Sequence, residues 1–226
     1  GCAGQSALLH RMNIFKAFFW VDTGDIALVR AQLAAFSKQV PLLYSTLCLN
    51  LGLCSLGFAP LLPWWQGVGV PAILVAACVG RMLVWLRDRH RVLTDAQARQ
   101  RIVGVVVLGS LIGCVVLAWL LSLFVASPTH EGRAHVVVAL SVTALCCMTC
   151  LMHLRAAARA IAVLTTIPFT AFLVFTGEPH FVIVGINVAL VMASIVYVYA
   201  VASNDFDRMI RLSTENARLA NVDSLT

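Results

Sequence analysis

Long apolar runs alternate with short polar stretches along this chain, and the alternation predicts its main elements. Each run approaches the roughly 20 mostly apolar residues that a helix needs to cross a membrane. The expected spanning segments are 40–62, 68–86, 102–126, 135–154, 160–177 and 181–203. The fifth contains Pro168, which a bundle tolerates because neighbouring groups satisfy the carbonyl that proline frees. The pattern therefore predicts an all-α integral membrane bundle of about six transmembrane helices over residues 40–203.

Residues 1–39 show a different pattern from the spanning segments. Towards the end of this stretch, apolar residues recur every three or four positions, which is typical of an amphipathic helix. These residues are Ile26, Val29, Leu33, Phe36 and Val40. We expect residues 1–39 to form a cytoplasmic segment whose helix lies either on the inner membrane surface or packed under the bundle.

The tail, residues 204–226, is charged and has its own spacing of apolar positions. Met209, Leu212, Asn216 and Leu219 follow an a–d–a–d rhythm, and an Asn at an a position fixes register in two-stranded coiled coils. This spacing predicts a cytoplasmic linker helix that runs out of the sixth span and pairs with a second copy. A single solvated helix is the alternative.

Composition excludes an ordinary soluble domain. The chain is 61% hydrophobic and only 12% charged, with a mean hydropathy of +0.92, whereas soluble domains carry about 25% charged residues. The net charge of +6 does not indicate nucleic-acid binding, because the charges lie in short loops between apolar runs. The lipid bilayer is therefore the expected environment of the chain.

The basic residues predict the orientation of the bundle. If both termini are cytoplasmic, all of the 16 Lys and Arg residues except Arg133 and Arg81 lie on the inner side. Arg133 falls in an outer loop and Arg81 within a span. Because cytoplasmic loops carry an excess of Lys and Arg, both termini are expected in the cytoplasm.

Three polar residues within the spans are candidate sites. Arg81 is costly in a membrane, and three explanations are open: a structural role, snorkelled towards the inner surface or bonded to carbonyls; binding of an anionic ligand; or pairing with another protein. Asn50 and Asn187, on the first and sixth spans, are interpreted as buried groups that hydrogen-bond between helices.

The segment CCMTCLMH offers a possible metal site. It places Cys146, Cys150 and His153 on one helix face, and soft ions such as Cu(I) prefer thiolate and imidazole ligands. The alternative is a packing face of small residues, because one helix rarely supplies a whole metal site. We identify no catalytic residue and expect no cofactor in this chain.

The last residues resemble a known family. RLSTENARLANVDSLT is similar to the segment that leads into bacterial GGDEF domains, where a signalling helix ends in Asp-x-Leu-Thr, here Asp223, Leu225 and Thr226. The stretches QLAAFSKQVPLLYSTLCLN and TDAQARQR resemble the membrane regions found upstream of GGDEF and GGDEF–EAL domains in proteobacteria.

The resemblance implies a sensor or anchor region in the bacterial inner membrane. It would regulate a diguanylate cyclase domain expected beyond Thr226, where GTP and Mg²⁺ would bind, and would work as a homodimer through the linker helix. A different class of protein is the alternative: a non-catalytic transmembrane subunit that packs against a larger membrane protein complex.

Overall fold

A computed structural model describes residues 26–88 and 93–223. Within these residues, six helices are long and apolar enough to cross a membrane, so the chain is a multi-pass membrane protein. The helices are α2 (Ile26–Phe58), α3 (Val70–Asp88), α4 (Asp95–Ala126), α5 (His130–Cys150), α6 (Arg155–Phe175) and α7 (Pro179–Asp223). A 3₁₀ turn (Ala59–Leu61) and a π-helical turn (Trp65–Gly69) join α2 to α3.

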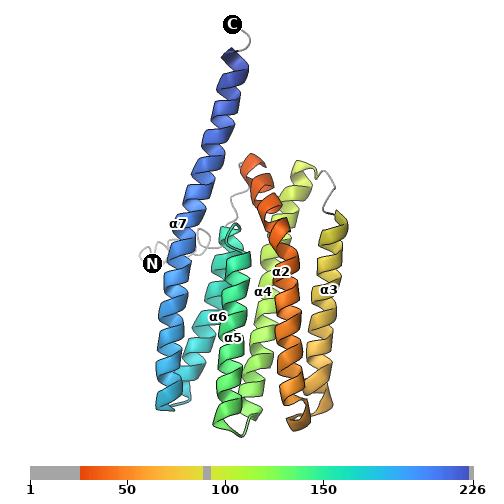
Figure 1. Ribbon diagram of the computed structural model, residues 1–226, viewed down its shortest axis with the longest axis vertical. Helices are drawn as coiled ribbons and strands as arrows, with labels where there is room; N and C mark the ends of the chain where they lie inside the picture. Colours follow the sequence, from red (N-terminus) through yellow and green to blue (C-terminus); the bar gives the residue numbers. More distant parts are fainter. Residues whose placement is uncertain (1–25, 89–92, 224–226) are drawn as a thin grey trace, which may run out of the picture.

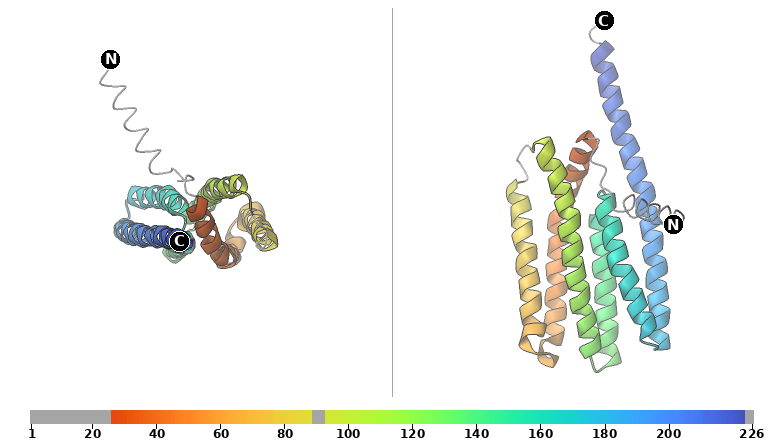
Figure 2. Two further views of the ribbon diagram at one scale, coloured as in Figure 1. Left: turned by 90° about the horizontal axis from the view of Figure 1, so that it is seen from above. Right: turned by 180° about the vertical axis from the view of Figure 1, so that it is seen from behind.

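The six helices form one bundle in which consecutive helices run in opposite directions, with α3 and α7 at opposite edges (Figure 1). α2 packs against α3 and α5, α4 packs against α5 and α6, and α7 packs chiefly against α6. α7 projects well beyond the other helices at one end, which we call the extended end (Figures 1 and 2). The other end, which carries the α2–α3, α4–α5 and α6–α7 connections, is called the loop end.

Most helices are longer at one or both ends than the apolar runs that predict them. α4 begins at Asp95, seven residues before the expected span, because Thr94 caps it: the Gln97 amide donates to Thr94 Oγ1, and the Gln97 side chain accepts from the Thr94 amide. α6 continues unbroken through Pro168. Polar capping, and not the edge of the apolar run, therefore decides where α4 begins.

Residues 26–39 belong to the first spanning helix. α2 runs without a break from Ile26 to Phe58, with Pro41 inside it. The predicted apolar stripe of this segment faces the bundle, where Val29, Phe36 and Val40 are buried. Neither expected position therefore describes residues 26–39, which are the first part of a spanning helix. Residues 1–25 of the expected interfacial segment lie outside the described residues.

Buried side chains gather in three clusters. The first lies towards the extended end and joins α2, α3, α4, α5 and the start of α6, with Phe36 and Trp85 in edge-to-face contact at 5.3 Å. The second lies towards the loop end and contains Leu120, Leu123 and Leu173. A small third cluster attaches α7, through Met192, to α5 and α6. α7 therefore packs mainly along α6, and much of the rest of its surface faces outward.

Candidate functional site

An arginine fastens α7 to the bundle at the extended end. Arg155, the first residue of α6, pairs with Asp207 on α7 at 2.6 Å between Nη2 and Oδ2. The same nitrogen donates to the Ser203 carbonyl at 2.8 Å, and Arg155 Nε donates to the Ser203 hydroxyl. One guanidinium therefore holds two successive turns of α7 at the point where this helix leaves the bundle. We call Arg155, Ser203 and Asp207 the α7 clamp.

The surroundings of the clamp combine apolar contacts with a small cavity. The His153 ring, in the turn between α5 and α6, lies 5.2 Å from the Phe206 ring of α7. Burial lowers the pKa of His153 below its ordinary value, so this imidazole favours the neutral form. A cavity of about 160 Å³ between α5, α6 and α7 adjoins the clamp and includes Tyr199 and Asn204 in its wall. The junction therefore has space to rearrange.

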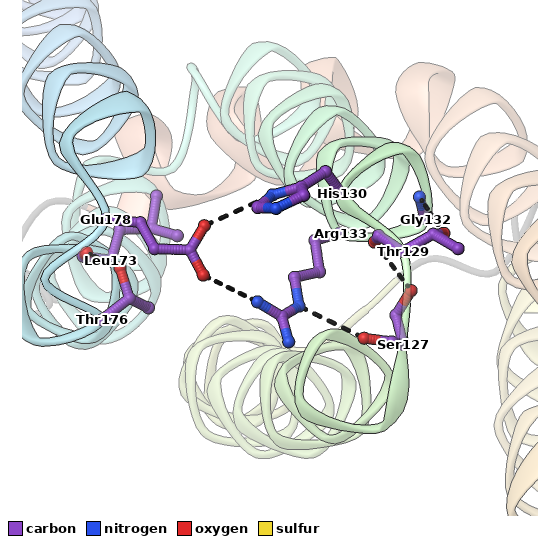
Figure 3. A network of polar contacts seen from close by, with 8 residues as sticks. All are labelled: Ser127, Thr129, His130, Gly132, Arg133, Leu173, Thr176 and Glu178. Atoms are coloured by element: carbon purple, nitrogen blue, oxygen red, sulfur yellow. Dashed lines mark hydrogen bonds and ion pairs between the residues drawn. The ribbon is translucent and has the colours of Figure 1, made fainter.

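A second polar network ties two loops together at the loop end (Figure 3). Glu178, just before α7, accepts a hydrogen bond from Arg133 at 2.7 Å and lies 3.4 Å from His130 Nδ1. Arg133 Nε also donates to the Ser127 carbonyl at 3.2 Å, and its guanidinium lies over the Phe124 ring. This network joins α4, α5 and the start of α7.

Arg81 lies between two cavities. On one side, it lines a largely apolar cavity of about 60 Å³ in the bundle core, together with Tyr44. On the other, it lines an open crevice of about 650 Å³ between α3 and α4. Its Nε is buried and has no hydrogen-bond partner within the described part of the chain. Arg81 therefore has hydrogen-bonding capacity that the described residues leave unused.

Asn50 and Asn187 differ in their surroundings. Asn50 Nδ2, on α2, donates to the Ala139 carbonyl of α5 at 3.0 Å and to the Thr143 hydroxyl, which is the expected kind of bond between helices. The expectation that Asn187 is buried is wrong. Its side chain is exposed on α7 and makes no hydrogen bond to any of the described residues. The reason is the position of α7 at the edge of the bundle, with this face turned outward.

The cysteine and histidine residues of CCMTCLMH do not share one helix face. α5 ends at Cys150, and His153 lies in the following turn against Phe206. Across residues 26–88 and 93–223, no group of three or more His, Cys, Asp and Glu residues is arranged to hold a metal ion. Cys150 is buried and Cys146 partly buried, both among apolar side chains.

The predicted linker seam lies on the projecting part of α7. Met209, Leu212 and Asn216 are exposed there, while the side chain of Leu219 lies outside the described residues. Of the family motif, Asp223 is the last residue of α7, and Leu225 and Thr226 lie outside the described residues.

Sequence reasoning missed the clamp. A signal was available: Arg155 lies between the fourth and fifth apolar runs and Asp207 follows the sixth, and alternating spans bring these positions to the same end of the bundle. Comparison with protein-family models, with curated proteins and with solved structures finds no match for this chain.

Proposed function

We propose that this chain is the membrane sensor region of a dimeric signalling protein, in which α7 carries a signal from the bundle to a cytoplasmic output domain. The observation that carries the proposal is the continuity of α7. This helix has 45 residues, or about 68 Å at 1.5 Å per residue, whereas the hydrocarbon core of a bilayer is about 30 Å thick. A helix without a break transmits rotation or translation from the membrane to whatever follows it.

The exposed face of α7 supports pairing between two copies. On a helix of 3.6 residues per turn, one set of the outward side chains forms a stripe that begins within the span and continues along the projecting part. It comprises Asn187, Leu190, Val191, Ser194, Val198, Val201, Asp205, Met209, Leu212 and Asn216. Two parallel copies of α7 would bury this stripe along its whole length.

Asn187 favours a second copy of the same helix as the partner. An exposed amide within the span meets lipid, which offers it no hydrogen bond. An amide both donates and accepts, so Asn187 of one copy satisfies Asn187 of another across a twofold axis. Such bonds contribute about 0.6–2 kcal/mol in membranes.

The α7 clamp gives the bundle a means of acting on this pair. Arg155 holds α7 where it leaves the bundle, so a displacement of α6 is passed to the projecting helix. The basic residues support a cytoplasmic extended end, since Arg87, Arg101 and Arg155 lie there and Arg133 lies at the loop end. The resemblance of the tail to GGDEF linkers makes a diguanylate cyclase the proposed output domain, and the inner membrane of a bacterium the proposed location.

The test uses the full-length gene product in membrane vesicles supplied with GTP and Mg²⁺. We expect synthesis of cyclic di-GMP and a dimer that can be captured by cross-linking through a cysteine introduced at Val191. Asn187→Leu should lower both the cross-linked fraction and the synthesis. Asn187→Gln, which keeps an amide, is the matched control and should restore much of both.

The outcomes separate the parts of the proposal. A full-length product that forms dimers but makes no cyclic di-GMP would refute the output domain and leave the dimer. Cross-linking that is equal in the wild type and Asn187→Leu would refute the α7 interface. Stoichiometric co-purification with a different membrane complex, without dimers, would instead establish a non-catalytic accessory subunit.

A further inference from the structure

The crevice between α3 and α4 is an opening in the wall of the bundle. α3 packs against α2 and makes few contacts with α4, which leaves the space of about 650 Å³ between them. Polar side chains line its end nearest the extended end, namely Asp88, Gln97, Gln100 and Arg101. Val84 and Gly104 line it as well, and both are exposed on the outer surface of the bundle, where a membrane presents acyl chains. The crevice therefore has a polar head and an apolar flank.

The crevice contains one cation that the described residues do not neutralise. Arg101 pairs with Asp88 and also lies 4.8 Å from the centre of the Trp85 ring. Arg81 has no ion pair with any described carboxylate, and its buried Nε lacks a hydrogen-bond partner among the described residues. The Arg81 side chain is partly exposed and only its Nε is fully buried, but an arginine within a membrane span is costly, so the arrangement favours a ligand that brings a negative charge.

The depth of Arg81 indicates what kind of anion reaches it. Arg81 precedes Asp88, the last residue of α3, by seven positions, or about 10 Å along the helix axis. A long arginine side chain at this depth reaches the level of lipid headgroups. The flank of the crevice opens sideways towards the bilayer, so an amphiphile enters without leaving the membrane.

We propose that this crevice binds an anionic membrane lipid. The lipid phosphate accepts hydrogen bonds from Arg81, the glutamine side chains of α4 contact the polar headgroup, and an acyl chain lies between α3 and α4 beside Gly104. The site does not depend on the output domain or on dimer formation. A lipid held there joins two helices that scarcely contact each other, and so it stabilises α3 against the rest of the bundle.

The test measures lipids that stay bound to the purified protein by native mass spectrometry, after titration with phosphatidylglycerol. We expect one tightly held phosphatidylglycerol, with phosphatidylcholine retained far less. Arg81→Gln should weaken the retention roughly tenfold to hundredfold, the effect of losing a charge-assisted bond to phosphate. Arg87→Gln, an exposed arginine on the same helix, is the matched control and should leave it unchanged.

A second pair of variants leaves the charge in place. A Cβ added at Gly104 meets nothing within 4 Å, so Gly104→Leu fills the flank of the crevice without a clash at its Cβ. It should displace the lipid, whereas Gly57→Leu, at an equally open glycine near the loop end of α2, should not. These variants keep the proposal testable if Arg81→Gln fails to fold.

Three results would overturn the proposal. Equal retention by the Arg81→Gln and Arg87→Gln variants would show that the guanidinium is structural. Equal retention of phosphatidylcholine and phosphatidylglycerol would show that the crevice does not select charge. Displacement of phosphatidylglycerol by inorganic phosphate alone would identify a site for a soluble anion instead of a lipid.

Discussion

Removal of the Arg155 side chain tests whether the clamp holds α7 against the bundle. In Arg155→Ala, Asp207 loses its ion pair and Ser203 loses two hydrogen bonds. We expect α7 to open locally near residues 200–210 while the rest of the bundle keeps its stability. The local character of the effect is the reason to choose this site, because Arg155 contacts α7 at the point where this helix leaves the bundle.

The size of the effect follows from the exposure of the two charges. Exposed ion pairs contribute about 0–1 kcal/mol, whereas hydrogen bonds to charged groups contribute about 1.5–3 kcal/mol. The Arg155 and Asp207 side chains are 33% and 16% exposed, so the pair lies between these limits. A loss of about 2 kcal/mol is expected, which raises the equilibrium for local opening roughly thirtyfold.

Amide hydrogen exchange in lipid nanodiscs measures this opening directly. Exchange in residues 200–210 should be roughly thirtyfold faster in Arg155→Ala than in the wild type. Arg208→Ala removes an exposed charge next to Asp207 and is the matched control. Asp207→Asn should have a similar effect to Arg155→Ala, and the double variant should add little, because both changes remove one interaction.

Two results would refute the reasoning. Exchange in Arg155→Ala that matches Arg208→Ala would show that the clamp contributes nothing. An increase spread evenly over all six helices would show that Arg155 stabilises the bundle as a whole and does not act locally on α7.

Other contacts give three more expected outcomes. Asn50→Leu removes a hydrogen bond between α2 and α5 and should lower the free energy of unfolding by about 0.6–2 kcal/mol, measured by detergent-induced unfolding. Burial lowers the pKa of His153 in the folded state, so the stabilising contribution of this residue is present above about pH 6.5 and is lost as the pH falls through the folded-state pKa. His153→Phe keeps an aromatic ring against Phe206 but cannot be protonated. The variant should therefore lose less stability than the wild type between about pH 7 and 5. Arg133→Gln breaks a partly exposed pair with Glu178 and should cost about 1 kcal/mol or less, a difference that unfolding in high salt should reduce.

The sequence predicted the spanning helices because insertion into a membrane depends on a local sum. About 20 consecutive apolar residues suffice for a span whatever lies elsewhere in the chain, so each run could be recognised alone. The extension of α2 back to Ile26 was harder to recognise. Residues 26–39 carry charges on one side, and only their packing against the rest of the bundle shows that the apolar stripe belongs to its core.

Tertiary structure decided which polar residues have partners. The apolar pattern gives the depth of a residue in the membrane but neither the order of the helices nor their rotation about their axes. Those two quantities bring Arg155 to Asp207, place Asn50 against α5 and turn Asn187 outward. They also set Arg81 between a core cavity and an open crevice. Each of these outcomes depends on contacts between helices that are distant in sequence. The hydrophobicity of a local stretch does not depend on such contacts and therefore cannot predict them.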